Sequence, residues 1–261
     1  MDLFLETQNL TKTFGGVAAI FNLSFATRKG SVYSVIGPNG AGKTTLFNLL
    51  TGIYKPTSGA IRFAGSSIVG QPPHKISRLG ISRTFQTPQI FLNMTVLENT
   101  LVGCHSHGTS GFFSAAISSP QSRREAARLK EQAMENLRFC GLDHLAQRDS
   151  DALPYGELKR LEVARALSTK PKLLLMDEPA AGLNDSETSK MGELIQGIQK
   201  LGISVMLVEH NMALVMAVSD ELLVLNYGEY LAEGTPEQIQ KNQKVIDAYL
   251  GMGDENDDLF D

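Results

Sequence analysis

A glycine-rich loop at residues 37–45, which reads GPNGAGKTT, constrains this chain more than any other stretch. It follows an apolar run at residues 32–36 with the length and β-branched character of a buried strand, and residues 46–50 continue as a helix. In such a loop backbone N–H groups surround the α- and β-phosphates of a nucleotide, a lysine reaches the β- and γ-phosphates, and a hydroxyl opening the helix can ligate Mg²⁺. The sequence therefore predicts a site for a nucleoside triphosphate with Mg²⁺, formed by Gly37, Pro38, Asn39, Gly40, Ala41, Gly42, Lys43, Thr44 and Thr45.

Composition narrows the classes of function. With 261 residues the chain can bury a large core, as one α/β domain or as one domain with an inserted subdomain. A net charge of −4 gives no global basic surface, which argues against nucleic acid as a partner. The apolar runs at residues 203–208 and 212–218 are far shorter than the roughly 20 residues that span a bilayer, so we do not expect the chain to cross a membrane by itself.

The two cysteines and the N-terminal sequence indicate the cellular compartment of the protein. Cys104 and Cys140 have neither metal nor redox spacing, and no signal peptide pattern opens the chain. These features favour a reducing cytosol and two ordinary buried thiols.

Alternating strand and helix patterns indicate the fold class. Short strands at residues 3–7, 23–27 and 60–63, separated by turns, predict a small antiparallel sheet near the N-terminus. Later apolar strands are separated by helices, which predicts a parallel sheet covered on both faces. These later strands are residues 81–85, 173–176, 203–208 and 222–225.

Residues 88–160 interrupt this alternation and are predicted to form a helical insert. Within it, Ser122 and Glu125 have capping-box spacing, which predicts a helix that begins there and ends at Gly141. We expect residues 1–251 to form a single domain. The acidic residues 252–261 are expected to be a disordered tail, because so short a charged segment cannot offset its ordering entropy.

Two more capping boxes mark later helix starts. Asn184 with Glu187 predicts the start of a helix after the strand at residues 173–176. Thr235 with Gln238 predicts a second start, and the proline between them suits the first helical position.

An acidic pair follows the apolar run at residues 173–176. Hydrolysis of a nucleotide requires a carboxylate near the metal and a group that orients the attacking water. Asp177 is placed to hold Mg²⁺, usually through water, and Glu178 to face the γ-phosphate as general base. An acidic turn after an ordinary strand would look the same in isolation, but the phosphate loop upstream favours the catalytic interpretation.

Four segments together resemble the ATP-binding cassette (ABC) ATPases: GPNGAGKTT, LLLMDEP, VEHN, and Gln86 between the first two. The resemblance extends from about residue 3 to about residue 251. It implies a RecA-like P-loop NTPase core with an antiparallel β subdomain and an inserted α-helical subdomain, in agreement with the α/β class indicated above. It also implies ATP and Mg²⁺ as ligands.

The resemblance implies roles for residues at matching positions. Phe14 lies where the family stacks an aromatic ring on adenine, although a buried aromatic at a strand end would give the same pattern. Gln86 matches the glutamine that senses the metal and the γ-phosphate, and His210 matches the switch histidine that contacts the γ-phosphate. The implied catalytic residues are Glu178, His210 and Gln86, and the implied metal ligands are Thr44, Gln86 and Asp177.

The segment at residues 153–157 departs from the family pattern. Where the family reads Leu-Ser-Gly-Gly-Gln, this chain reads LPYGE. In the family this segment opens a helix that closes on ATP held by another subunit, so Tyr155, Gly156 and Glu157 are implied nucleotide contacts. Pro154 has no hydroxyl for the γ-phosphate, whereas the backbone of Gly156 and the positive end of the helix remain. The two sites of a dimer could therefore differ.

Finer features resemble the ATPase subunit of branched-chain amino acid importers. They are the segments FGGV, TFQ, TVLEN, the Tyr-Gly form of the signature, AEGTP and VIDAYLG. This likeness implies a second, different ATPase subunit, transmembrane permease subunits, an external solute-binding protein and a position on the cytoplasmic face of the cell membrane. A groove near residues 86–94 would receive a short helix of the permease, with Pro88, Ile90, Phe91 and Met94 holding it.

The sequence leaves other functions open. A related importer of urea or other amino acids would carry a similar ATPase. A soluble cassette protein that acts in translation or DNA repair is disfavoured, because such chains commonly carry two cassettes or long coiled insertions. A regulatory module without hydrolysis is disfavoured because Lys43, Asp177, Glu178 and His210 are all present.

Overall fold

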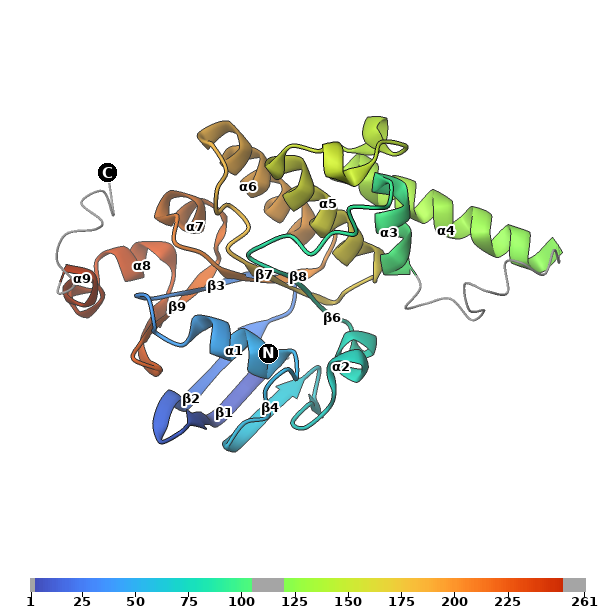
Figure 1. Ribbon diagram of the computed structural model, residues 1–261. Helices are drawn as coiled ribbons and strands as arrows, with labels where there is room; N and C mark the ends of the chain where they lie inside the picture. Colours follow the sequence, from blue (N-terminus) through green and yellow to red (C-terminus); the bar gives the residue numbers. More distant parts are fainter. Residues whose placement is uncertain (1–2, 105–119, 251–261) are drawn as a thin grey trace.

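The computed structural model describes residues 3–104 and 120–250, so the expected acidic tail at residues 252–261 lies outside the described residues. A six-stranded sheet crosses the middle of the molecule, with most helices above it and a smaller sheet below it in the view of Figure 1. Helix α1 (Lys43–Leu50) packs between the two sheets. The predicted α/β class is confirmed.

The central sheet is parallel except at one edge. Its order is β10-β9-β3-β8-β7-β6, and only β10 runs antiparallel to its neighbour. The sequence did not predict β10. The strands are β3 (Val32–Ile36), β6 (Ile81–Thr84), β7 (Leu173–Asp177), β8 (Ser204–Val208), β9 (Glu221–Asn226) and β10 (Glu229–Gly234).

Each inner strand is buried on both faces, and its side chains alternate between two cores. In β7, Leu174 and Met176 join the core under the helices, whereas Leu173 and Leu175 join the core shared with the small sheet. This alternation follows from the two-residue repeat of a strand. It also explains why β3, β7 and β8 are mostly apolar rather than alternating with polar residues, since a parallel sheet is covered on both sides.

The small sheet is antiparallel, as predicted, and has the order β2-β1-β4-β5. Its strands extend well beyond the predicted segments, because register shifts let β1 and β2 bend and continue pairing. They are β1 (Leu3–Phe14), β2 (Val17–Arg28), β4 (Ser58–Phe63) and the two-residue β5 (Ser66–Ser67).

Among the described residues between β6 and β7, the regular elements are helices. This stretch contains α3 (Val96–Cys104), α4 (Pro120–Phe139), two short 3₁₀ turns (Asp143–Leu145 and Ser150–Ala152) and α5 (Tyr155–Ser168). Helix α4 extends beyond the rest of the molecule at the right of Figure 1. The remaining helices are α2 (Pro73–Leu79), α6 (Asp185–Lys200), α7 (Met212–Val218), α8 (Pro236–Gln240) and α9 (Gln243–Leu250).

Of the three helix starts predicted from capping boxes, two are confirmed and one is wrong. Asn184 and Thr235 each form the predicted capping box, so both of those starts are confirmed. The prediction that a helix begins at Ser122 is wrong, because α4 already begins at Pro120. Proline suits the first turn of a helix, where its missing N–H costs no hydrogen bond, so the helix starts two residues earlier than the capping pattern indicates.

Among the described residues, none of the helices is both long enough and apolar enough to cross a bilayer.

Burial of the two cysteines gives a first testable prediction. Burial raises the pKa of the Cys104 thiol and raises the pKa of the Cys140 thiol to about 12. A rise of that size lowers the thiolate fraction of Cys140 at pH 8 by on the order of a thousandfold. We expect both thiols to react slowly with a disulfide reagent in the native protein and at once in denaturant, as followed by the absorbance of the released thiolate. Rapid labelling of the native protein would contradict the described packing.

Candidate nucleotide-binding and catalytic site

The phosphate loop joins β3 to α1 and depends on glycine at two points. Gly37 and Gly42 have positive φ values of 146° and 99°. A Cβ atom at Gly37 would lie 2.1 Å from the carbonyl oxygen of Leu225, and one at Gly42 would lie 2.5 Å from that of Ala19. Backbone carbonyl oxygens of other segments lie against the loop at both positions, so only glycine fits there. Without side chains at these positions, the backbone of the loop can also pass close to a bound phosphate.

Lys43 is the one basic side chain of this loop, and it is buried. Its Nζ donates hydrogen bonds to the carbonyl oxygens of Gly37 at 2.5 Å and Pro38 at 2.9 Å. Burial lowers the pKa of Lys43, and the charges of Glu178 and Asp177 partly offset that effect. The ammonium group is thus held at the start of α1, where the helix dipole also favours an anion.

Asp177 ends β7 and is paired with a basic residue that the sequence did not single out. Arg83 Nη2 lies 2.6 Å from Asp177 Oδ2, and Arg83 Nη1 donates to Asn48 Oδ1 at 2.6 Å. The guanidinium carbon lies 5.5 Å from the ring centroid of Phe47 and 5.0 Å from that of Phe85. Both charged side chains are nearly buried, so the pair fixes the carboxylate at the end of the strand.

The three predicted catalytic residues meet at one carboxylate. Gln86 Nε2 donates to Glu178 Oε2 at 2.6 Å, and His210 Nε2 lies 3.2 Å from Glu178 Oε1. The backbone of Glu178 is left-handed, with φ at 46°, and its N–H donates to the carbonyl of Val208 at 2.8 Å. A left-handed backbone is unfavourable for a residue with a Cβ, and such strain gathers at functional sites. The arrangement can orient a water molecule and accept its proton.

Glu209 is a second residue that the sequence reasoning missed. Its side chain is buried, and its carboxylate accepts hydrogen bonds from the backbone N–H groups of Ala180 at 2.7 Å, His210 at 2.8 Å and Asn211 at 3.1 Å. It therefore joins the loop after Glu178 to the loop that carries the histidine. A glutamate directly after a buried, mostly apolar strand was the available signal, because a buried carboxylate needs partners.

The donor set fits Mg²⁺. Thr44 lies in the first turn of α1, Asp177 ends β7, and the side-chain oxygen of Gln86 is the atom not used in its bond to Glu178. All three offer oxygen, which Mg²⁺ prefers. Within the described ranges no three His, Cys, Asp or Glu side chains form a metal cage.

Phe14 ends β1 and is exposed rather than buried, with 43% of its surface accessible. Its ring meets Tyr54 edge to face at 5.1 Å, and Lys12 Nζ lies 4.7 Å from its centroid. The alternative of a buried strand-end aromatic is therefore wrong. Stacking on adenine stays a prediction.

Tyr155 and Gly156 open α5, with Pro154 as the residue before its first turn. Tyr155 is 42% exposed, and its hydroxyl lies 3.4 Å from the carbonyl oxygen of Gln86. A Cβ at Gly182 would lie 3.1 Å from its ring. The divergent tyrosine thus contacts two loops of the catalytic region of its own chain.

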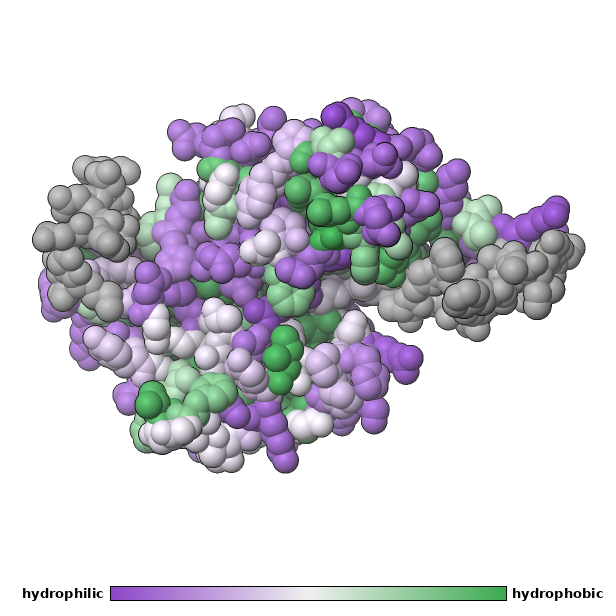
Figure 2. Space-filling view, in the orientation of Figure 1, coloured by the Kyte–Doolittle hydropathy of each residue, from purple (hydrophilic) through white to green (hydrophobic). Residues whose placement is uncertain are grey.

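A cavity of about 350 Å³ opens between α2, β6, α3 and α5. It lies beside the predicted docking segment, but the residues that line it are not Pro88, Ile90, Phe91 and Met94. The guanidinium of Arg165, which lines the cavity, lies 5.8 Å from the exposed ring of Phe91. Figure 2 shows hydrophobic residues gathered over the region of α3 and α5. The lining residues include Ile53, Ile76, Phe85, Val102, Glu162 and Arg165.

The phosphate loop after β3 and the acidic pair at the end of β7, two strands away in the sheet, define a P-loop nucleoside triphosphatase. Comparison with known proteins defines the family. A family model described as "ABC transporter" matches residues 20–181, and one described as "Branched-chain amino acid ATP-binding cassette transporter" matches residues 231–254. The chain therefore belongs to the ABC transporter family, and the resemblance noted in the sequence is confirmed.

Similar proteins and structures agree with this assignment. The high-affinity branched-chain amino acid transport ATP-binding protein BraF of Pseudomonas aeruginosa is 46% identical over 248 residues, covering 95% of this chain and 97% of that protein. LivG of Escherichia coli K12, with the same description, is 44% identical with the same coverage. A nucleotide-free ATP-binding cassette from an ABC transporter has a TM-score of 0.82 at 35% identity, covering 95% of this chain and 98% of the other. A cassette in its ADP conformation has a TM-score of 0.83 at 34% identity, covering 96% and 100%.

The Arg83–Asp177 pair predicts a large effect on stability. Arg83→Met leaves the Asp177 carboxylate buried without its cation, which should lower the free energy of unfolding by about 3–5 kcal/mol. Urea denaturation without nucleotide measures this change. Arg62→Met on β4 is the control, because Arg62 is exposed and its loss should cost less than about 0.5 kcal/mol. Equal stability of the two variants would contradict the role given to this pair.

Proposed function

We propose that this protein is the ATP-hydrolysing subunit of an ABC importer, and that the transported solutes are branched-chain amino acids. The observation that carries the ATPase proposal is the Glu178 carboxylate, held between Gln86 and His210 beside the acidic end of β7. The solute is supported by the descriptions of the similar proteins BraF and LivG and by the family model that matches residues 231–254.

The proposed reaction uses residues of this chain for distinct tasks. Phe14 stacks on the adenine, and the loop at residues 37–45 surrounds the phosphates while Lys43 neutralises their charge. Glu178 orients a water molecule and accepts its proton as the water attacks the γ-phosphate. His210 contacts that phosphate and Gln86 positions the carboxylate. When bound by Thr44, Asp177 and Gln86, Mg²⁺ would stabilise the negative charge that develops on the phosphates.

The proposed assembly is a dimer of ATPase subunits on the cytoplasmic face of the cell membrane. Each ATP lies between the phosphate loop of one subunit and the start of the α5-type helix of the other. We infer a partner that is a paralogue, two transmembrane permease subunits and an external solute-binding protein. In this proposal residues 1–251 act as one nucleotide-binding domain, and the helical subdomain at residues 88–160 meets the permease.

Two alternatives are kept. An importer of urea or other amino acids would use the same ATPase chemistry, because the solute does not contact this subunit. A soluble ABC ATPase without a transport partner would need no docking surface, whereas this chain has an apolar cavity beside an exposed phenylalanine. Copurification with membrane subunits in detergent separates transport from the soluble alternative.

Hydrolysis at Glu178 is tested by Glu178→Gln. The amide keeps the size of the side chain but cannot accept the proton, so steady-state hydrolysis should fall by about 10²–10⁴-fold while ATP affinity changes little. Phosphate release and equilibrium nucleotide binding measure the two quantities. Glu193→Gln on the exposed side of α6 is the matched control. Full turnover by the Glu178 variant would remove this residue as the base.

Docking is tested by Phe91→Asp and Met94→Asp in the intact transporter. Burying a carboxylate in an apolar interface is costly, so each variant should shift the subunit from the membrane fraction to the soluble fraction. The assay is fractionation and copurification with the permease. Leu201→Asp is the control, since Leu201 is 60% exposed at the far end of α6. Normal copurification and transport by both test variants would overturn the proposed docking site.

A further inference from the structure

Lys159 is a charged side chain placed inside the protein. It lies in the second turn of α5 and only 2% of its surface is exposed. Its Nζ donates hydrogen bonds to two backbone carbonyl oxygens, that of Gln86 at 2.6 Å and that of Glu178 at 2.8 Å. One ammonium group therefore joins α5 to the two loops that supply the catalytic carboxylate and its amide partner.

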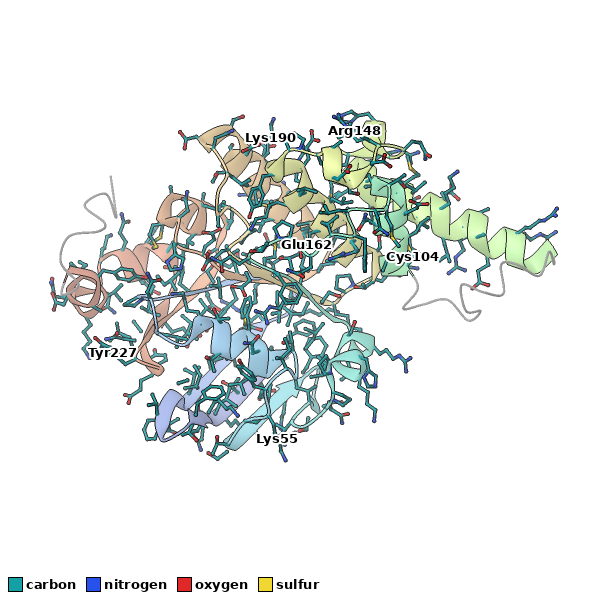
Figure 3. The ribbon with its side chains drawn as sticks, viewed as in Figure 1. Lys55, Cys104, Arg148, Glu162, Lys190 and Tyr227 are labelled. Carbon is teal, nitrogen blue, oxygen red and sulfur yellow. The ribbon has the colours of Figure 1, made fainter. Side chains whose placement is uncertain are left out.

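The surroundings of Lys159 show that this position is built for a cation. Four carboxylates act on it, those of Glu162, Glu209, Glu178 and Asp177. Figure 3 places Glu162 near the middle of the molecule, between the helices and the central sheet. Burial lowers the pKa of Lys159, and the four carboxylates oppose that shift. A methionine would fill this space without desolvating a charge, so the ammonium is explained by the bonds that it makes.

One of these bonds acts on an unfavourable backbone. Glu178 is left-handed; its N–H donates to the carbonyl of Val208 at 2.8 Å, and its own carbonyl oxygen accepts from the N–H of Ala181 at 3.2 Å. Lys159 adds a charged and shorter hydrogen bond, at 2.8 Å, to that same carbonyl oxygen. Because the backbone torsions set the direction of the side chain, fixing both peptide groups also fixes where the Glu178 carboxylate points.

The second bond acts on the partner of that carboxylate. The side-chain amide of Gln86 donates to Glu178, while the backbone carbonyl of the same glutamine accepts from Lys159. The Tyr155 hydroxyl approaches this carbonyl as well, at 3.4 Å. Lys159 thus restrains the backbone on both sides of the Gln86–Glu178 hydrogen bond.

We propose that Lys159 is a positioning residue for hydrolysis: its ammonium fixes the backbones of Gln86 and Glu178 together and so sets the position of the catalytic carboxylate. This inference rests on the proposed ATPase function. Because Lys159 belongs to α5, a displacement of α3–α5 relative to β7 lengthens or breaks both bonds. The orientation of the helices then decides whether Glu178 is aligned with the attacking water.

The first test compares Lys159→Met and Lys159→Arg. Misplacing a catalytic group by about 1 Å costs on the order of 100-fold, so Lys159→Met should lower kcat by about 10–100-fold and leave ATP affinity within about threefold. Lys159→Arg should recover at least about fivefold of that loss, because a guanidinium can also donate to two carbonyls. Lys190→Met is the matched control, since Lys190 is exposed on α6 (Figure 3). Unchanged kcat in Lys159→Met, or kcat and ATP affinity lost together, would overturn the proposal.

The second test separates positioning from general damage. If Lys159 acts through Glu178, Lys159→Met should change the residual rate of the Glu178→Gln enzyme by less than about twofold. A purely structural role would lower the rate by the same factor in both backgrounds, which would overturn the inference. If Lys159→Met does not fold, Lys159→Gln takes its place in both tests.

Failure of the proposed function has a different signature. Full turnover by Glu178→Gln alone would refute Glu178 as the base, whatever Lys159 does. An inactive Glu178→Gln enzyme together with normal kcat in Lys159→Met would refute only the positioning role.

Discussion

The site depends on the parallel pairing of β3 with β8 and of β8 with β7. This pairing sets Val35 beside Val208 and Val208 beside Asp177, so three strands end at the same edge of the sheet. The phosphate loop follows the first strand, the acidic pair closes the third, and Glu209 with His210 follows the second. The loops that follow parallel strands all lie at the same edge of the sheet. Segments more than 160 residues apart in sequence therefore meet at this edge.

Buried ionic groups then fix the loops that leave this edge. Arg83 holds the Asp177 carboxylate. Glu209 accepts from backbone N–H groups of the loops after β7 and β8, and Lys159 donates to carbonyl oxygens of the loops after β6 and β7. A buried charge without partners is costly, so each of these residues restrains the backbone that satisfies it. Apolar packing alone would leave the loops free to take several conformations, whereas directional bonds select one.

Local periodicity and motif spacing predicted the alternation of strands and helices, the phosphate loop, Asp177 and Glu178. The roles of Gln86 and His210 came from the resemblance to the ABC ATPases. Neither predicted the roles of Arg83 and Lys159, whose partners depend on tertiary contacts. Lys159 bonds the backbone carbonyls of Gln86 and Glu178, and any residue type at those two positions would offer the same oxygen. The sequence did not predict β10 because that edge strand is exposed or half-buried along most of its length and carries polar residues, so it lacks the continuous apolar run of the inner strands. The start of α4 was displaced because a proline competed with the capping pattern.

The contacts of Lys159 and Tyr155 also concern the start of α5, where the sequence departs from the family pattern. Tyr155 stands where the family has a small residue, and its ring lies 5.6 Å from the ammonium of Lys159 while its hydroxyl approaches the carbonyl of Gln86. A cation near an aromatic face is attracted to it, so the tyrosine reinforces the lysine that bonds both catalytic loops. In the proposed dimer, Pro154 offers no hydroxyl to the partner's nucleotide, while Tyr155 contacts the catalytic region of its own chain. The start of α5 is therefore bonded to the catalytic loops of its own chain through Tyr155 and Lys159.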